Sequence, residues 1–497
     1  MAGAALALWV AGCAGLPLHV QKYPTQALRD PASTTLGRLV ARSEQGNNLS
    51  GIRLLSSGDE ALASLIALAD RAERTLDIQY YLIHQDASAA LLLQHVRRAA
   101  DRGVRVRLLV DDLNTAGEDR RFMHLGEHVN VQVRVFNPFP GGRSALWTRI
   151  LTSVSEIPRI NHRMHNKLFV ADNAVAITGG RNIGDQYFTR DQTSNFIDLD
   201  VVAAGRIVPQ LSASFDAFWN SKYAYPIGSV VSPVEAEPVP PLQAEGDMGG
   251  EASWLAHELD GGNLQLLWVP ATVLADRPAK IATVATEDGE ETIANDLKAL
   301  MRSAQHEVIV ISPYFVPGTD GLELMRDLVR RGVHIRILTN SLASTDSPLV
   351  DNGYSRYRVA LLKLGVELAE VRPKLGQKRK RFHPFRSANA SLHAKAVVID
   401  QDTVFIGSLN MDARSARTNS ELGLVIRSRE IAHQVTTLLD DISADGSYRL
   451  RLDAGGRVVW SSGEPGAEQI WHTDPETTRM QRFLLELLAP FAPEELL

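Results

Sequence analysis

The chain has 497 residues, more than one typical domain, and its 44% hydrophobic and 22% charged residues are ordinary for a globular protein. Its formal net charge is −6, which argues against a protein that mainly covers long stretches of nucleic acid, because such proteins need a basic surface. With Cys13 as its single cysteine, the chain can form no intramolecular disulfide.

The first predicted element is a short apolar segment. Residues 6–15 read LALWVAGCAG and end in small residues around Cys13. One interpretation is a secretory signal or a buried apolar segment. We favour a second, a signal peptide ending in a sequence that resembles a lipobox, with a lipid attached to Cys13 after cleavage. Beyond this segment no apolar run approaches the roughly 20 residues that span a bilayer, so we expect a membrane-anchored protein.

One unit occurs twice along the chain. Leu91–Leu113 (LLLQHVRRAADRGVRVRLLVDDL) and Leu322–Leu342 (LELMRDLVRRGVHIRILTNSL) both begin with helical spacing, pass through Arg-Gly-Val and continue as a β-rich apolar run. Each unit also opens with a candidate strand, at Thr75–Ile83 and Glu307–Val316. This order predicts an α/β sandwich with a mixed or partly parallel sheet. We expect two pseudo-twofold-related halves that form one active site.

The repeats and the composition predict the domain organisation. A stretch rich in Pro, Glu and Gly separates the halves and shows no periodicity. Near the C-terminus, Met480–Phe491 reads as an amphipathic helix, which we expect to pack against the core rather than a membrane. The predicted segments are a signal peptide (1–13), an N-terminal extension (14–50), the first half (51–228), a linker (229–255), the second half (256–445) and a C-terminal hairpin and helix (446–497).

Two segments carry matching chemical groups. Residues 165–182 read HNKLFVADNAVAITGGRN, and residues 393–410 read HAKAVVIDQDTVFIGSLN. Alternate side chains of a strand share a face, so the histidine and lysine of each segment would project together. The segments lie 228 positions apart, while the Arg-Gly-Val repeats lie 229 apart, so two unrelated hairpins are a poor explanation. The candidate site residues are His165, Lys167, Asp172 and Asn182 in the first segment and His393, Lys395, Asp400, Ser408 and Asn410 in the second.

Two histidines that meet in one cleft suit phosphoryl transfer from a diester. One imidazole attacks phosphorus and forms a covalent intermediate, while the other donates a proton to the leaving alcohol and removes one from the acceptor. The lysines and asparagines supply donors to the non-bridging oxygens. No metal ion or other cofactor is then needed. Spacing alone does not say which histidine is the nucleophile.

The repeated pattern H-x-K-x4-D-x6-G-[SG]-x-N resembles the HKD signature of the phospholipase D superfamily. The second copy agrees completely, and the first carries Gly180 in place of the serine. The resemblance extends from about Gly51 to the C-terminus. It implies that His165 is the nucleophile, that His393 is the general acid and base, and that the motif aspartates position the local loops.

Two further acids follow the motifs. Asp198 in FIDLDVVAAG and Glu421 in TNSELGLVI occupy similar places. A carboxylate there would hydrogen-bond the far nitrogen of a histidine, fix its tautomer and raise its basicity. The alternative is an ordinary charge at a strand end, and we favour the first interpretation.

The flanks resemble one branch of the superfamily, the C-type bacterial cardiolipin synthases. The matching segments are YYLIHQDASAALLL, RVRLLVDDLNT, RMHNKLFV, GGRNIGDQYF and SLHAKAVVID. The resemblance implies transfer of a phosphatidyl group to phosphatidylglycerol, with phosphatidylethanolamine as donor. The expected partners are these phospholipids and a membrane of the bacterial cell envelope, where the protein would be lipid-anchored and face the periplasm. We expect no nucleic acid partner, and the need for an accessory membrane protein stays open.

Three alternatives remain. The nearest is a phospholipase D that gives the phosphatidyl group to water and releases phosphatidic acid. The second is a metal-independent phosphodiesterase or nuclease, against which the acidic charge and the lack of interleaved basic and aromatic residues count. The third is an inactive membrane-bound scaffold, which the two complete motifs disfavour.

Overall fold

The computed structural model describes residues 16–17, 20–44, 46, 48–113, 115, 118–143, 147–149, 153, 156–231, 253–282, 292–374, 389–463 and 468–488. The predicted signal peptide with Cys13 and most of the predicted linker lie outside the described residues.

The first half is built on a nine-stranded sheet. Its strands are β1 (Ser50–Leu55), β2 (Thr75–Tyr80), β3 (Arg105–Asp111), β4 (Val131–Phe136), β5 (Leu168–Ala171), β6 (Val175–Gly179), β8 (Asp200–Gly205), β9 (Ala224–Pro226) and β10 (Leu267–Val269). They lie in the order β10-β1-β8-β6-β5-β2-β3-β4-β9. β2, β3 and β4 run parallel to one another, and the other neighbours pair antiparallel.

The second half repeats this arrangement in a ten-stranded sheet. Its strands are β11 (Ala271–Ala275), β12 (Glu307–Ile311), β13 (His334–Asn340), β14 (Glu367–Val371), β16 (Ala396–Ile399), β17 (Thr403–Gly407), β18 (Leu422–Arg427), β19 (Ser447–Leu452), β20 (Val458–Ser462) and β21 (Gln469–Trp471). The order is β11-β18-β17-β16-β12-β13-β14-β19-β20-β21. From β1 to β9 and from β11 to β19 the connectivity is the same, which confirms the predicted duplicated α/β sandwich.

Helices cover the sheets. In the first half and the connection they are α2 (Thr35–Glu44), α3 (Gly58–Arg71), α4 (Ala87–Asp101), α5 (Asp119–Gly126), α7 (Ile157–Ile160), α8 (Ile207–Trp219), α9 (Ile227–Val230), α10 (Trp254–Gly261) and the 3-10 helices η1 (Pro31–Ser33), η3 (Asp185–Phe188) and η4 (Pro278–Ala282). In the second half they are α11 (Ile293–Arg302), α12 (Gly318–Arg330), α13 (Pro348–Ser355), α14 (Arg358–Leu364), α15 (Ala413–Arg417), α16 (Arg429–Asp445) and α17 (Arg479–Leu488).

The repeated Arg-Gly-Val marks the end of a helix in each half. Gly103 follows α4 and Gly332 follows α12, with φ of 96° and 84°. Glycine adopts this left-handed conformation without the steric cost of a Cβ, which is why it commonly ends a helix. The chain then turns directly into β3 or β13.

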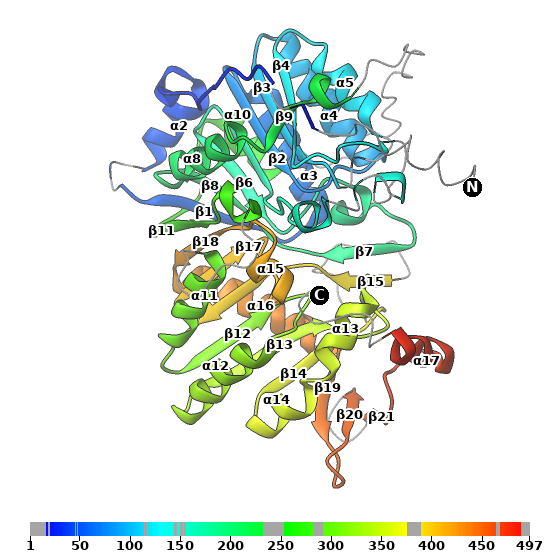
Figure 1. Cartoon of the computed structure of the whole chain (residues 1–497). Coiled ribbons are helices and arrows are strands. Elements are labelled where there is room, and N and C mark those ends of the chain that lie inside the picture. Colours follow the sequence, from blue (N-terminus) through cyan, green and yellow to red (C-terminus); the bar gives the residue numbers. More distant parts are fainter. Residues whose placement is uncertain are drawn as a thin grey trace, which may run out of the picture.

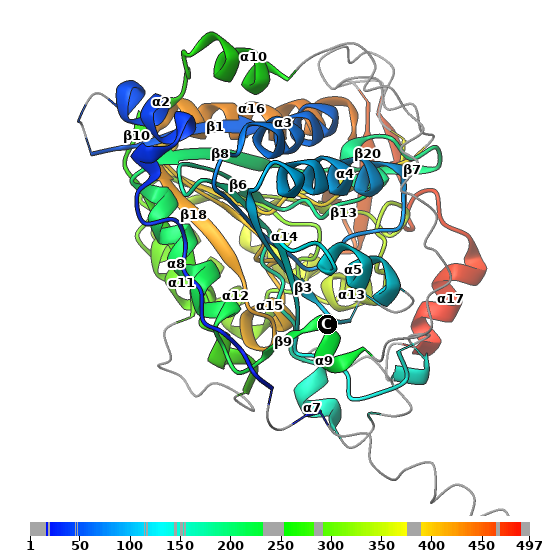
Figure 2. The ribbon, with the colours of Figure 1, turned by 90° about the horizontal axis from the view of Figure 1, so that it is seen from above.

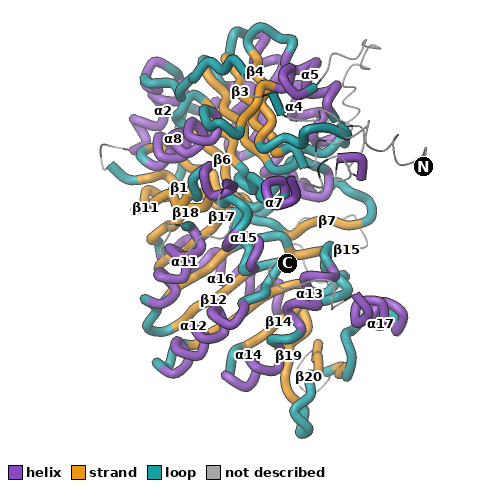
Figure 3. Tube along the Cα trace, in the orientation of Figure 1, coloured by secondary structure: helices purple, strands orange, loops and turns teal. Residues whose placement is uncertain are grey.

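Three buried clusters form the core. α3 and α4 pack on the outer face of the first sheet, and α11 and α12 on the outer face of the second. The third cluster joins the inner faces of both sheets with α8 and α16. The halves therefore stack on one another, as Figures 1 and 2 show from two directions. The tube view in Figure 3 shows the strands of both halves inside flanking helices.

The C-terminal helix differs from our expectation. α17 lies beside α13 at the edge of the molecule. Its apolar residues Met480, Phe483, Leu484 and Leu487 are 64%, 59%, 47% and 57% exposed. Their i, i+3, i+4, i+7 spacing places them on one face of the helix, so the prediction that this face packs against the core is wrong. Among the described residues, no helix combines the length and the apolar content needed to cross a bilayer.

Candidate active site

Pairing between the halves brings the two motifs together. β7 (Ser194–Ile197) and β15 (Asn389–Leu392) form a two-stranded parallel sheet. A single parallel bridge between Met164 and Ser420 is its counterpart on the other side of the pseudo-twofold axis. Each of these pairings ends directly before a motif histidine on one chain segment and directly before an acid on the other. The backbone therefore places each histidine beside an acid of the opposite half.

His165 is paired with Glu421. Its Nδ1 lies 2.9 Å from Oε2 and 3.1 Å from Oε1 of that carboxylate, and both residues are buried. Because an ionised carboxylate only accepts, Nδ1 carries the proton and Nε2 keeps its lone pair. Burial lowers the pKa of His165 to about 4, although the charge of Glu421 acts in the opposite direction. The imidazole is therefore neutral at physiological pH, as a nucleophile must be.

His393 is paired with Asp198 in the same way. Its Nδ1 lies 2.6 Å from Oδ2 of that carboxylate. Burial acts to raise the pKa of Asp198, but the adjacent His393 and Lys395 lower it to about 2. Burial also lowers the pKa of His393, and Lys395 adds to this, while Asp198 opposes it. A carboxylate that stays ionised thus stabilises the imidazolium that a general acid requires.

The motif lysines lie beside the histidines. Lys167 Nζ donates to the carbonyl of His165 at 2.5 Å, and Lys395 Nζ lies 2.9 Å from Nδ1 of His393. Burial lowers the pKa of Lys395 to about 8 and that of Lys167 well below its usual range. The charge of Lys395 also lowers the pKa values of both Lys167 and His165. The two motifs therefore share one electrostatic environment, in which an anionic diester would favour the charged lysines.

The motif asparagines are buried next to this centre. Asn182 Nδ2 donates to the hydroxyl of Tyr187 at 2.9 Å. The side-chain oxygens of Asn182 and Asn410 have no hydrogen-bond partner within the described part of the chain. Buried amide groups normally find partners, so these two amides have hydrogen-bonding capacity left for a ligand.

Gly180 and Ser408 explain the chemical difference between the halves. Ser408 Oγ hydrogen-bonds Glu421 and accepts from the backbone amide of Leu422 at 3.0 Å. A Cβ at Gly180 would lie 2.1 Å from Oδ1 of Asp198. Serine at this position of the first half would therefore collide with the acid that holds His393. In the second half, the serine hydroxyl instead contacts the acid that holds His165.

The motif aspartates lie at the far ends of β5 and β16 from the histidines. Asp172 accepts from the backbone amides of Glu73, Arg74 and Thr75 at 2.8 to 2.9 Å. Asp400 accepts from the three equivalent amides, Gln305, His306 and Glu307. Both aspartates have left-handed backbone conformations, with φ of 53° and 52°. Each one joins the motif hairpin to the start of the neighbouring strand, β2 or β12.

Aromatic rings that we did not predict surround the histidines. Tyr81 packs edge-on to His165, with ring centroids 5.0 Å apart. Tyr187 and Phe196 contact His393 at centroid distances of 5.2 and 5.0 Å. The only signal in the sequence was that these aromatic residues lie in the flanks of the motifs. Their position in the sequence does not indicate which way their side chains point. These rings limit the positions that the imidazoles can occupy.

Comparison with known proteins agrees with this architecture. Residues 65–219 and 297–442 match the family described as "Cardiolipin synthase, PLD-like domain". Cardiolipin synthase C of Escherichia coli is 37% identical over 460 residues, covering 90% of this chain and 96% of that protein. An uncharacterized protein of Helicobacter pylori is 31% identical over 490 residues, covering 96% of this chain and 95% of that protein.

Among solved structures, phosphatidylserine synthase of Haemophilus influenzae shares the fold. The TM-score is 0.58 at 14% identity, and the match covers 92% of this chain and 100% of that chain. Both matched regions contain one histidine–lysine motif with its supporting strands. The chain therefore belongs to the cardiolipin synthase family of the phospholipase D superfamily.

Proposed function

We propose that the protein is a phosphatidyltransferase that makes cardiolipin from phosphatidylglycerol and a donor phospholipid, phosphatidylethanolamine. The observation that carries this proposal is the reciprocal pairing of His165 with Glu421 and of His393 with Asp198. In both pairs Nδ1 is occupied, so the two Nε2 atoms are the groups available to one diester. The similarity over 90% of the chain to a protein named cardiolipin synthase C favours lipid substrates.

The first half-reaction forms a covalent intermediate. Nε2 of neutral His165 attacks phosphorus of the donor, and the bond from phosphorus to the head-group oxygen breaks. Nε2–H of protonated His393 gives its proton to that oxygen, so ethanolamine leaves with a hydroxyl group and not as an alkoxide. Lys167 and Lys395 stabilise the negative charge on the non-bridging oxygens.

The second half-reaction transfers the phosphatidyl group. His393, now neutral, removes the proton from the terminal hydroxyl of phosphatidylglycerol, and this oxygen attacks phosphorus. The bond between phosphorus and His165 breaks, and both histidines return to their starting states. Transfer competes with hydrolysis, so the site must exclude water while it admits a glycerol head group.

A position at the membrane of the bacterial cell envelope fits this chemistry. Both substrates reside in the bilayer, and the exposed apolar face of α17 is suited to interfacial binding. A lipid on Cys13 would supply a second attachment and place the enzyme on the periplasmic side. Two membrane signals together give stable association where one is marginal.

A product assay tests the proposal. The protein without its first 13 residues is incubated in mixed vesicles with head-group-labelled phosphatidylethanolamine, with and without phosphatidylglycerol. We expect cardiolipin only when both lipids are present, with ethanolamine released in step. Phosphatidic acid as the main product in both samples would mean that water is the acceptor. Cleavage of DNA without added metal, and no lipid product, would favour a nuclease.

A further inference from the structure

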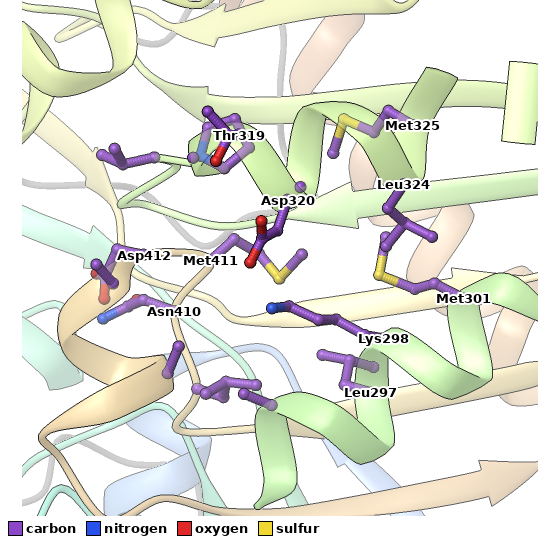
Figure 4. Close-up of a pocket in the computed structure, with 18 of the residues that line it drawn as sticks. Leu297, Lys298, Met301, Thr319, Asp320, Leu324, Met325, Asn410, Met411 and Asp412 are labelled. Carbon is purple, nitrogen blue, oxygen red and sulfur yellow. The ribbon is translucent and has the colours of Figure 1, made fainter. Parts of the chain in front are cut away.

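A cavity of about 300 Å³ lies behind the second motif. Its volume is at the lower end of the range of small-ligand pockets, about 300–1,000 Å³. The space lies between α11, α12, α15 and the chain segment that contains Asn410 (Figure 4). Aliphatic and thioether side chains form most of the lining, including Leu297, Met301, Val316, Leu324, Met325 and Leu409. Methionines adapt to ligands of variable shape.

The two halves differ at one position that bears on this cavity. Phe188 and Ala416 each follow their motif asparagine by six residues and lie in equivalent short helices, η3 and α15. Phe188 is fully buried within the first hydrophobic core. Ala416 instead lines the cavity. The smaller side chain in the second half therefore leaves space where its counterpart fills the core.

At a second position, the apolar residue of the first half corresponds to a cation in the second half. Ile66 and Lys298 each lie nine residues before the first residue of the following strand, β2 or β12, so they are equivalent. Ile66 is buried in the core, whereas Lys298 lines the cavity. Figure 4 shows Lys298 on α11 and Asp320 on α12 reaching into the space toward Met411. Lys298 forms no ion pair with any described residue, and Asp320 also lacks one.

The cavity adjoins the reaction centre through the segment Leu409–Asp412. This segment lines the space and contains the motif Asn410, whose buried side-chain oxygen has no partner among the described residues. It also contains Asp412; burial lowers the pKa of Lys395, and the charge of Asp412 is one of several that oppose this effect. A molecule bound in the cavity would therefore lie against the back of the phosphate-binding residues.

We propose that this cavity binds one acyl chain of a phospholipid substrate, with the hydrocarbon among Leu297, Met301, Leu324 and Met325 and an anionic or ester oxygen near Lys298. The choice of an acyl chain over a head group follows from the lining, which is mainly aliphatic. Charged side chains of both signs, Lys298, Arg417, Asp320 and Asp412, also line the space, and Lys298 is the cation that Figure 4 shows reaching into it. A side chain that fills the cavity would weaken the binding of a long-chain substrate, and it would leave every group that takes part in the reaction in place. This inference rests on the proposed function only for the identity of the lipid.

Ala416→Phe tests the proposal because it introduces, in the second half, the residue that the first half has at the equivalent position, Phe188. We expect wild-type protein to bind dodecyl phosphate below its micelle concentration in calorimetry, and the variant to bind at least tenfold more weakly, since excluding two methylenes is worth about tenfold. The ratio of kcat/KM for dipalmitoyl over dihexanoyl phosphatidylethanolamine should also fall about tenfold or more. The proposal would be overturned if the folded variant bound dodecyl phosphate as tightly as wild type and kept the same chain-length ratio of kcat/KM.

Lys298→Met is the second variant, and it keeps the length of the stem while it removes the charge. We expect weaker binding of dodecyl phosphate but not of dodecanol, because only the former presents an anion. Equal binding of dodecyl phosphate by this variant and wild type would contradict the role of Lys298. The calorimetric test needs no turnover. Binding without cardiolipin formation would refute the proposed function alone, and cardiolipin formation without binding would refute this inference alone.

Discussion

Removal of the charge on Asp198 should change the pH dependence of the reaction. Asp198→Asn keeps an oxygen that accepts from Nδ1 of His393 but removes the negative charge. In the wild type, the pKa of the Asp198 carboxyl is about 2, so this charge is present at every assay pH. A buried charge-assisted hydrogen bond is worth about 1.5–3 kcal/mol. One pKa unit corresponds to about 1.4 kcal/mol. The pKa of His393 should therefore fall by about one to two units.

The direction of the effect follows from the role of His393 as general acid. Burial lowers the pKa of His393 in the folded protein, and the ionised Asp198 opposes this effect. Without that charge the imidazolium would lose its proton at a still lower pH. In a pH profile of kcat/KM measured with vesicles, the alkaline limb should move down by about one to two units. The maximum should fall about 10- to 100-fold, as is usual when such a partner is lost.

Asp172→Asn is the matched control. It also replaces a buried carboxylate of the first half, but one that binds backbone amides at the far end of β5. We expect it to lower the free energy of unfolding and to leave the alkaline limb in place. An unshifted limb in the Asp198→Asn variant, or the same shift in the control, would refute the assignment of His393 as general acid.

His165→Asn should abolish turnover without changing thermal unfolding. It should also abolish the covalent label that the wild-type protein acquires from a donor lipid with a radioactive phosphatidyl group. A label that persists would assign the nucleophile to the other histidine. Gly180→Ser should lower kcat more than tenfold, because the new Cβ would lie 2.1 Å from Oδ1 of Asp198. Ser408→Gly removes the hydroxyl that hydrogen-bonds Glu421 and accepts from the amide of Leu422, but it introduces no collision and should be milder. The reverse order would contradict the steric argument. Phe483→Glu should weaken sedimentation with anionic vesicles, since its side chain is 59% exposed on α17, while Val129→Glu, at a 90% exposed position elsewhere, should not; equal effects would exclude a specific docking role for α17.

Much of the fold was predictable because it rests on repeated local signals. The glycines that end α4 and α12 recur at nearly constant separation, since both halves need a left-handed residue at the same turn. The alternation of helical and β-rich segments around them indicated the duplicated sandwich. The exposure of α17 was not predictable, because an amphipathic pattern specifies an apolar face but not what covers it.

The sequence by itself identified the groups that we expect to take part: two histidines, two lysines, two asparagines and two acids in matching order. Only the tertiary structure decided that the acids cross over, Asp198 to His393 and Glu421 to His165. These partners are 195 and 256 positions apart, and no local spacing encodes such a contact. The first contact arises because β7 pairs with β15 across the halves and places the residue after each strand beside its partner. The second arises in the same way from the bridge between Met164 and Ser420. Sequence spacing describes one strand or helix, whereas the site is built where two of them meet.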